Sequence, residues 1–258
     1  MSDLIARGRI QLGAFRNAWR NLLTSLMARM GTGGAILTGP FQGVKLCSTI
    51  AFGTSGGNLA AKLLGSYEAE LHDAIDRIIA AKPRVIVNVG SGDGYYVCGF
   101  AARLPQCQII AYEADELSRE ACARNLAINR LEASATIRGF ATVEDLKESL
   151  TGEQACLMVD CEGGELDLVD LEKLPALKST TILVEVHDFV RPGIGKTILE
   201  RLSRTHTVAR MDQASRPVPI PGLPGWLAPW NFFLQDERRG VAENYWLFFT
   251  PAADPAHS

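Results

Sequence analysis

The amino-acid sequence predicts an α/β protein built on a mostly parallel, Rossmann-like sheet. Three observations favour this fold class. Short apolar segments alternate with amphipathic segments from residue 84 to residue 204, a glycine repeat follows the first apolar segment, and an acid follows the second. Strands of a parallel sheet are apolar throughout because helices cover both faces. With 258 residues the chain is long enough for one sizeable core.

The alternation predicts the elements in order. Apolar runs indicate strands, and runs with apolar residues at three- and four-residue steps indicate helices. Strands are expected at 84–89, 107–112, 134–139, 155–160 and 180–187, and helices at 67–81, 95–104, 115–130, 143–150, 164–173 and 194–204. Two last strands, at 205–211 and 244–250, have no helical pattern between them. They are expected to pair antiparallel and complete a seven-stranded sheet.

An N-terminal appendage, residues 1–34, is expected to precede a main domain at 35–258. Residues 3–30 predict one amphipathic helix with an apolar face. Its basic side chains are Arg7, Arg9, Arg16, Arg20 and Arg29. Three interpretations stay open: packing on the domain or in a homodimer, contact with an anionic membrane, or a mitochondrial presequence. A short hairpin is expected at 35–47, around two glycines.

A segment rich in proline, glycine and tryptophan, residues 215–239, separates the last two strands. Long insertions without regular structure are often functional, so it is expected to form a lid. Trp226, Trp230 and Phe232 offer flat apolar faces that either stack on a bound ring or bury against the end of the sheet.

Composition narrows the classes of function. The chain has 26 Lys and Arg against 29 Asp and Glu, a formal charge of −3, which disfavours a nucleic-acid partner. The six cysteines form no CxxC pair and no framework spacing, and most lie in apolar runs, where a thiol behaves as a small apolar side chain. No secretory signal and no apolar run of about 20 residues stand out, and a cytoplasmic protein is expected.

The glycine repeat distinguishes between ligands. It runs Gly90-x-Gly92-x-Gly94, whereas a dinucleotide-binding loop would place its third glycine where Tyr95 stands. This spacing resembles motif I of the class I S-adenosylmethionine (SAM) methyltransferases. Glu113 ends the second strand, where a carboxylate is a natural partner for a ribose diol.

Acids and one histidine are expected to gather where the later strands end, because ligands of open α/β sheets bind at the carboxyl ends of strands. Asp160 is expected to act as a general base, a metal ligand, an acceptor for the SAM amino group, or a helix cap. Glu185 and His187 share one face of their strand, and His187 is either a general base, a metal ligand or a structural histidine. The candidate metal ligands are Asp160, His187 and Asp188. Oxygen ligands favour magnesium, and a histidine adds preference for manganese or iron.

Four segments together resemble the FkbM-like SAM-dependent methyltransferases. They are Leu64–Leu71, Val87–Tyr96 with its glycines, Val159–Glu165, and Val184–His187. The resemblance implies a class I methyltransferase fold and O-methylation of hydroxyls on sugars, polyketides or other natural products. Matching positions imply that Gly90, Gly92 and Glu113 bind SAM, that Tyr67 and Glu68 lie near its methionine end, and that Asp160 and Glu162 face the reacting centre. Asn88 departs from the family, which usually has an acid there.

The sequence therefore predicts a SAM-dependent O-methyltransferase of a small hydroxylated acceptor. The expected catalytic residues are His187, Asp160 and Glu162. The expected cofactor-binding residues are Tyr67, Glu68, Asn88, Gly90, Ser91, Gly92, Glu113, Ala114, Phe140 and Asp160. The alternatives are N- or S-methylation of a small molecule or peptide, and a non-catalytic SAM-binding scaffold. A nicotinamide enzyme ranks last.

Overall fold

A computed structural model describes residues 19–47, 58–151, 154–237 and 244–252. Its centre is one seven-stranded sheet with the order β3-β2-β1-β4-β5-β7-β6. The strands are β1 (Val85–Val89), β2 (Gln108–Tyr112), β3 (Ala135–Arg138), β4 (Ala155–Val159), β5 (Thr181–Val186), β6 (His206–Asp212) and β7 (Tyr245–Pro251). The first five are parallel, and β7 runs antiparallel between β5 and β6. The predicted fold class is confirmed.

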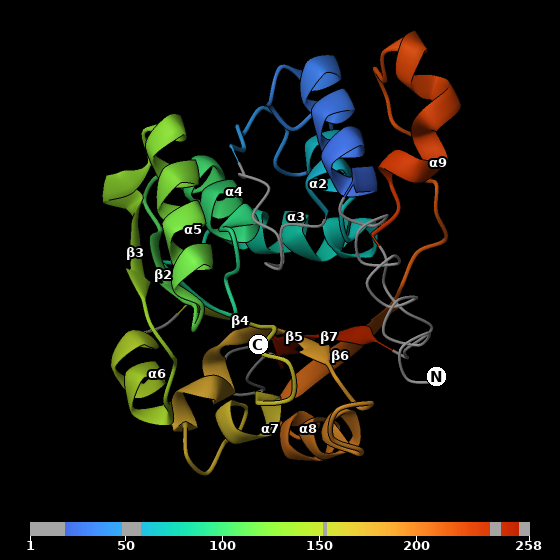
Figure 1. Ribbon diagram of the computed structural model, residues 1–258. Helices are drawn as coiled ribbons and strands as arrows, with labels where there is room; N and C mark the ends of the chain where they lie inside the picture. The colour runs from blue at the N-terminus through green and yellow to red at the C-terminus, as the bar shows by residue number, and fades with distance from the viewer. Residues whose placement is uncertain (1–18, 48–57, 152–153, 238–243, 253–258) are drawn as a thin grey trace, which may run out of the picture.

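Helices cover both faces of the sheet (Figure 1). One layer holds α2 (Leu59–Leu64), α3 (His72–Ala81), α4 (Tyr95–Arg103) and α5 (Glu116–Asn129). The other holds α6 (Val143–Ser149), α7 (Glu165–Leu168) and α8 (Ile194–Leu202). Strand residues alternate between two apolar clusters, one under each layer. In β1, Ile86 packs with the first layer, while Val85 and Val87 pack with the second.

Two helices differ from the expected bounds. The helix expected at 67–81 begins at His72, because Glu68 adopts a left-handed backbone (φ 47°) and a single 3-10 turn follows it. The helix expected at 164–173 ends at Leu168. There the side chain of Asp170 accepts a hydrogen bond from the backbone N–H of Glu172 (2.9 Å), a local bond that competes with helical pairing.

The described part of the N-terminal appendage is a helix at 19–32; the rest of the amphipathic pattern lies outside the described residues. Figure 1 shows this helix beside α9 (Asn231–Leu234). Leu227, which is fully buried, lies against Gly31, and Arg20 forms a 2.6 Å ion pair with Asp236. The helix therefore packs on the segment that precedes β7. In the described ranges no helix has the length and apolarity to cross a membrane.

The hairpin expected at 35–47 contains one antiparallel bridge between Ala35 and Lys45. The short helix α2 was not expected from the sequence. It ends at Gly65, which adopts a left-handed backbone, and the chain then turns toward Tyr67 and Glu68 at the carboxyl edge of the sheet.

Candidate active site

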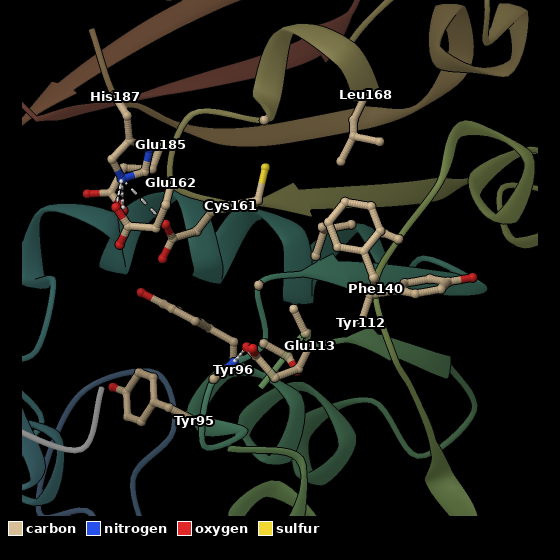
Figure 2. Close-up of a pocket in the computed structure, with 18 of the residues that line it drawn as sticks. Tyr95, Tyr96, Tyr112, Glu113, Phe140, Cys161, Glu162, Leu168, Glu185 and His187 are labelled. Carbon is tan, nitrogen blue, oxygen red and sulfur yellow. Dashed lines mark hydrogen bonds and ion pairs between the residues drawn. The ribbon is translucent and has the colours of Figure 1, made fainter. Parts of the chain in front are cut away.

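A cavity of about 850 Å³ opens at the carboxyl ends of β1, β2, β4 and β5. Its wall includes the glycine loop after β1, the ends of the next strands, and part of the segment between α2 and α3. Figure 2 shows His187 and Phe140 well apart in this cavity, with Glu113 below both of them in this view. The cavity therefore lies at the carboxyl ends of the strands, where ligands of open α/β sheets bind.

Two glycines shape the loop in different ways. Gly90 has a φ of 76°, and a Cβ at this position would collide with the carbonyl oxygen of Asp160, so the loop packs directly on the end of β4. Gly92 has a φ of 54°, and a Cβ there would meet no atom within 4 Å. Gly92 also lines the cavity, and its lack of a side chain leaves the backbone of the loop accessible there.

Glu113 directs its carboxylate to the glycine loop. Its Oε2 accepts a hydrogen bond from the N–H of Gly92 (2.7 Å), and its Oε1 accepts one from the N–H of Asp115 (2.8 Å). A carboxylate accepts about four hydrogen bonds, so about two acceptor positions remain. Ser91 adds a buried hydroxyl that has no hydrogen-bond partner among the described residues. Ala114 also lines the cavity.

Asn88 is not part of the cavity wall. It lies in β1, is almost fully buried, and its Oδ1 has no hydrogen-bond partner in the described part of the chain. Phe140 lies at the mouth of the cavity with 77% of its surface exposed. Its ring therefore has an open face for a flat ligand.

Tyr67 and Glu68 both line the cavity, and Glu68 is almost fully buried. Tyr96 donates a hydrogen bond to the Glu68 carboxylate. Burial and the nearby charge of Glu68 raise the pKa of Tyr96, so this phenol stays protonated and can donate. A buried ion pair lies alongside, in which Lys62 and Asp93 are 2.7 Å apart. These groups form a polar wall under the glycine loop.

Four carboxylates surround the ring of His187. The Nε2 atom lies 3.6 Å from Asp160, 3.5 Å from Glu162 and 3.7 Å from Glu185. The Nδ1 atom lies 2.7 Å from the buried carboxylate of Glu165. Strands β4 and β5 pair in parallel in the sheet, and this pairing brings the residues after their carboxyl ends together.

Charge and burial shift two pKa values in this cluster. Burial lowers the pKa of His187. The hydrogen bond to Glu165 and the charge of Asp160 raise this pKa by more than burial lowers it, so the net shift is upward. Burial, followed by the charge of Glu68, raises the pKa of Asp160 to about 6. Asp160 therefore exchanges its proton closer to neutral pH than an isolated carboxylate does.

Asp188 does not join this cluster. Its carboxylate accepts hydrogen bonds from the N–H of Gly195 (3.1 Å) and from the hydroxyl of Tyr245 (3.0 Å). Neighbouring residues at a strand end project to opposite sides, so Asp188 lies away from His187. Glu185, two residues before His187, occupies the place expected for Asp188 among the candidate metal ligands.

Sequence reasoning missed several residues of this site. Lys62, Asp93, Tyr95 and Tyr96 all line the cavity. Lys62 had a signal in the sequence, since it is the one charged residue of an otherwise apolar helix, LAAKLL. A lysine in such a place needs a partner. In the sequence Glu165 stands out only as the last residue of the segment Val159–Glu165, but in the structure it holds the imidazole of His187.

The expected lid does not reach the cavity within the described residues. None of the described positions of 215–239 lines it, and Asn244 is the nearest lining residue along the chain. Trp226 and Trp230 are about half exposed at the surface. The segment contacts the cavity wall through Glu237, whose Oε1 accepts a hydrogen bond from the N–H of Glu68 (3.2 Å) and lies 2.8 Å from Nη2 of Arg216.

Comparison with known proteins gives structures but no sequence relatives. No family model matches the chain, and neither does any curated protein. The METTL16 methyltransferase domain is 14% identical, covers 91% of this chain and 96% of its own, and has a TM-score of 0.52. The human methyltransferase 10 domain containing protein is 13% identical with the same coverage and TM-score. The chain has a class I methyltransferase fold. An O-methyltransferase from Bacillus cereus in complex with SAH is also similar, at 12% identity over 74% of this chain and 80% of its own, with a TM-score of 0.48.

Proposed function

We propose that this protein is a SAM-dependent methyltransferase. The observation that carries the proposal is the Glu113 carboxylate, held against the open side of the Gly92 loop with acceptor positions left over. A ribose diol presents two hydroxyl donors to such a carboxylate. The unpartnered hydroxyl of Ser91 offers a further polar contact in the same wall.

The rest of the cavity supports the same ligand. The exposed ring of Phe140 offers a face to an adenine. Tyr67 and Glu68 would hold the methionine end, since they lie on the polar wall below the glycine loop. Asn88 would take no direct part, because it does not line the cavity. When bound, SAM supplies an electrophilic methyl group carried by a positively charged sulfur.

The cluster around His187 favours a hydroxyl as the acceptor. An alcohol has a pKa far above 7, so an O-methyltransferase must supply a group that accepts the hydroxyl proton or lowers the pKa of the hydroxyl. A thiol or an amine needs less help. Asp160 and Glu162 line the same cavity as Glu113, and the Nε2 of His187 lies within 3.6 Å of both. These groups would hold the acceptor hydroxyl and accept its proton. The FkbM-like O-methyltransferases are the family we propose.

Isothermal titration with S-adenosylhomocysteine (SAH) tests the cofactor. Glu113→Ala removes the carboxylate that would accept two charge-assisted hydrogen bonds from the ribose hydroxyls. Each such bond is worth about 1.5–3 kcal/mol, so we expect the affinity for SAH to fall by about 100-fold or more. Glu116→Ala is the matched control, because this exposed acid begins α5 and does not line the cavity. Equal affinities for wild type and Glu113→Ala would contradict the proposal.

Incubation with methyl-labelled SAM and a panel of hydroxylated, amino and thiol acceptors tests the reaction. Product mass gives the number of methyl groups, and NMR identifies the methylated atom. Methylation at oxygen is expected. Methylation only at nitrogen or sulfur would contradict the acceptor class, and SAH binding without any transfer in single-turnover assays would favour a scaffold.

A further inference from the structure

His187 has the properties of a metal ligand as well as those of a base. The side chain is almost fully buried, yet its Nε2 points to three carboxylate oxygens at 3.5–3.7 Å and makes no hydrogen bond among the described residues. His187 also lines the cavity, so a ligand or ion in the cavity can reach this nitrogen. The geometry leaves this nitrogen directed at a point between the carboxylates, as Figure 2 shows for Glu162 and Glu185.

The separations are close to those of atoms that share one cation. Donor atoms lie about 2.0–2.2 Å from a manganese- or zinc-sized dication, so adjacent donors on it are about 3.0–3.6 Å apart and opposite donors about 4.3 Å apart. Asp160, Glu185 and His187 each place one donor atom within 4.8 Å of the others. The 3.6 and 3.7 Å separations from Nε2 are too long for hydrogen bonds and lie at or just above the upper end of the range for adjacent donors, so a small shift of the side chains would bring these atoms onto one ion.

Glu165 supplies the second layer that histidine ligands need. Its Oε1 lies 2.7 Å from Nδ1 of His187 and also accepts a hydrogen bond from the N–H of Gly163 (3.0 Å). A carboxylate at Nδ1 holds the proton on that nitrogen and leaves the lone pair on Nε2. This carboxylate–histidine pair orients the lone pair toward Asp160 and Glu185.

Charge favours a dication over a proton at this place. Four carboxylates lie within 3.7 Å of the ring nitrogens, and even a protonated imidazole balances only one of them. Carboxylate donors suit magnesium and manganese, while an imidazole donor adds affinity for manganese, iron and zinc. A set of two carboxylates and one imidazole therefore best suits a manganese-type ion.

We propose that Asp160, Glu185 and His187 bind one divalent cation of the manganese type, that Glu165 positions the imidazole, and that Glu162 lines the open side. Three protein donors leave further coordination positions open to the cavity. The role of this cation in the reaction rests on the proposed function. A cation here would lower the pKa of an acceptor hydroxyl that reaches it, and the exposed carboxylate of Glu162 would take the proton.

Electron paramagnetic resonance of Mn²⁺ tests the site on the full chain after treatment with EDTA. The decrease of the free Mn²⁺ signal during a titration measures the bound ion, and we expect one ion bound per chain. Pulsed spectra should show coupling of this ion to one ¹⁴N nucleus. Asp160→Asn and Glu185→Gln should each weaken binding by about tenfold or more, and His187→Asn should abolish the ¹⁴N coupling. Glu165→Gln should weaken binding about 10- to 100-fold but keep the coupling.

Asp167→Asn is the matched control. Asp167 lines the same cavity and its side chain is 68% exposed, but it lies outside the cluster, so Mn²⁺ affinity should change by less than about twofold. Circular dichroism establishes that each variant folds. Should the buried variants fail to fold, the part-exposed Asp160→Asn and the ¹⁴N coupling of the wild type still decide the question.

Absence of stoichiometric Mn²⁺, absence of ¹⁴N coupling, or an equal loss in Asp167→Asn would overturn the site. SAH titration of the same EDTA-treated protein separates the two proposals. SAH binding without Mn²⁺ binding removes the cation site and leaves the proposed function standing. Mn²⁺ binding without SAH binding removes the proposed function and leaves the cation site standing.

Discussion

Arg216 is expected to be among the largest single contributions to stability outside the apolar core. Its guanidinium contacts two acids, with Nε and Nη2 at 3.0 and 2.8 Å from Glu237 and Nη2 at 2.9 Å from Glu70. The three side chains are 11%, 1% and 4% exposed. Arg216→Ala would leave two buried carboxylates without this cation. Breaking a buried ion pair from one side costs about 3–5 kcal/mol.

Such a loss is a large part of the roughly 5–15 kcal/mol that stabilises a typical domain. It should lower Tm by roughly 6–20 °C, and urea unfolding at pH 7 gives the free energy directly. Lys196→Ala is the control, because this lysine and Glu200 form a 3.9 Å pair with both side chains largely exposed. Its removal should cost no more than about 0.5 kcal/mol. A loss below about 1 kcal/mol for Arg216→Ala would refute the reasoning.

Further predictions concern the loop, the insertion and pH. Gly90→Ala should not yield folded protein by circular dichroism, because its Cβ would meet the carbonyl of Asp160. Gly92→Ala should fold at a cost of roughly 1–2 kcal/mol for its left-handed backbone, yet weaken SAH binding because the strained loop lines the cavity and donates to Glu113. Leu227→Ala should cost about 2–5 kcal/mol in urea unfolding, since the side chain is fully buried. Burial lowers the pKa of His206, so only the unfolded chain takes up a proton near pH 6.5. The free energy of unfolding should therefore fall as pH drops below about 6.5, and His206→Gln should reduce that slope.

The sheet was predictable because its signals are local and repeated. Each buried strand is a short apolar run, and each parallel crossover needs a helix, so alternation in the sequence specifies the order of elements. The absence of a helical pattern before β7 predicts its antiparallel pairing, which the structure confirms. Helix ends were less predictable, because the Glu68 side chain meets a partner far along the chain, and the Asp170 side chain competes locally with helical pairing.

The site divides in the same way. Asp160, Glu185 and His187 were expected at one edge because parallel strands end together, and period-two alternation in a strand puts Glu185 rather than Asp188 beside His187. Applied strictly, that alternation would have excluded Asp188 from the candidate ligands. Lys62 reaches the cavity only through the packing of α2, and the insertion before β7 packs on helix 19–32. Contacts between segments so distant in sequence leave no local pattern.

The position of β7 bears on how the nascent chain assembles. This strand is synthesised after β6 but lies between β5 and β6, so neither neighbour finds its final partner until β7 has left the ribosome. Until then β5 presents an unpaired apolar edge, and such edges recruit other chains. Synthesis of the segment between β6 and β7 therefore sets an interval of exposure, during which a chaperone that shields β5 would reduce aggregation.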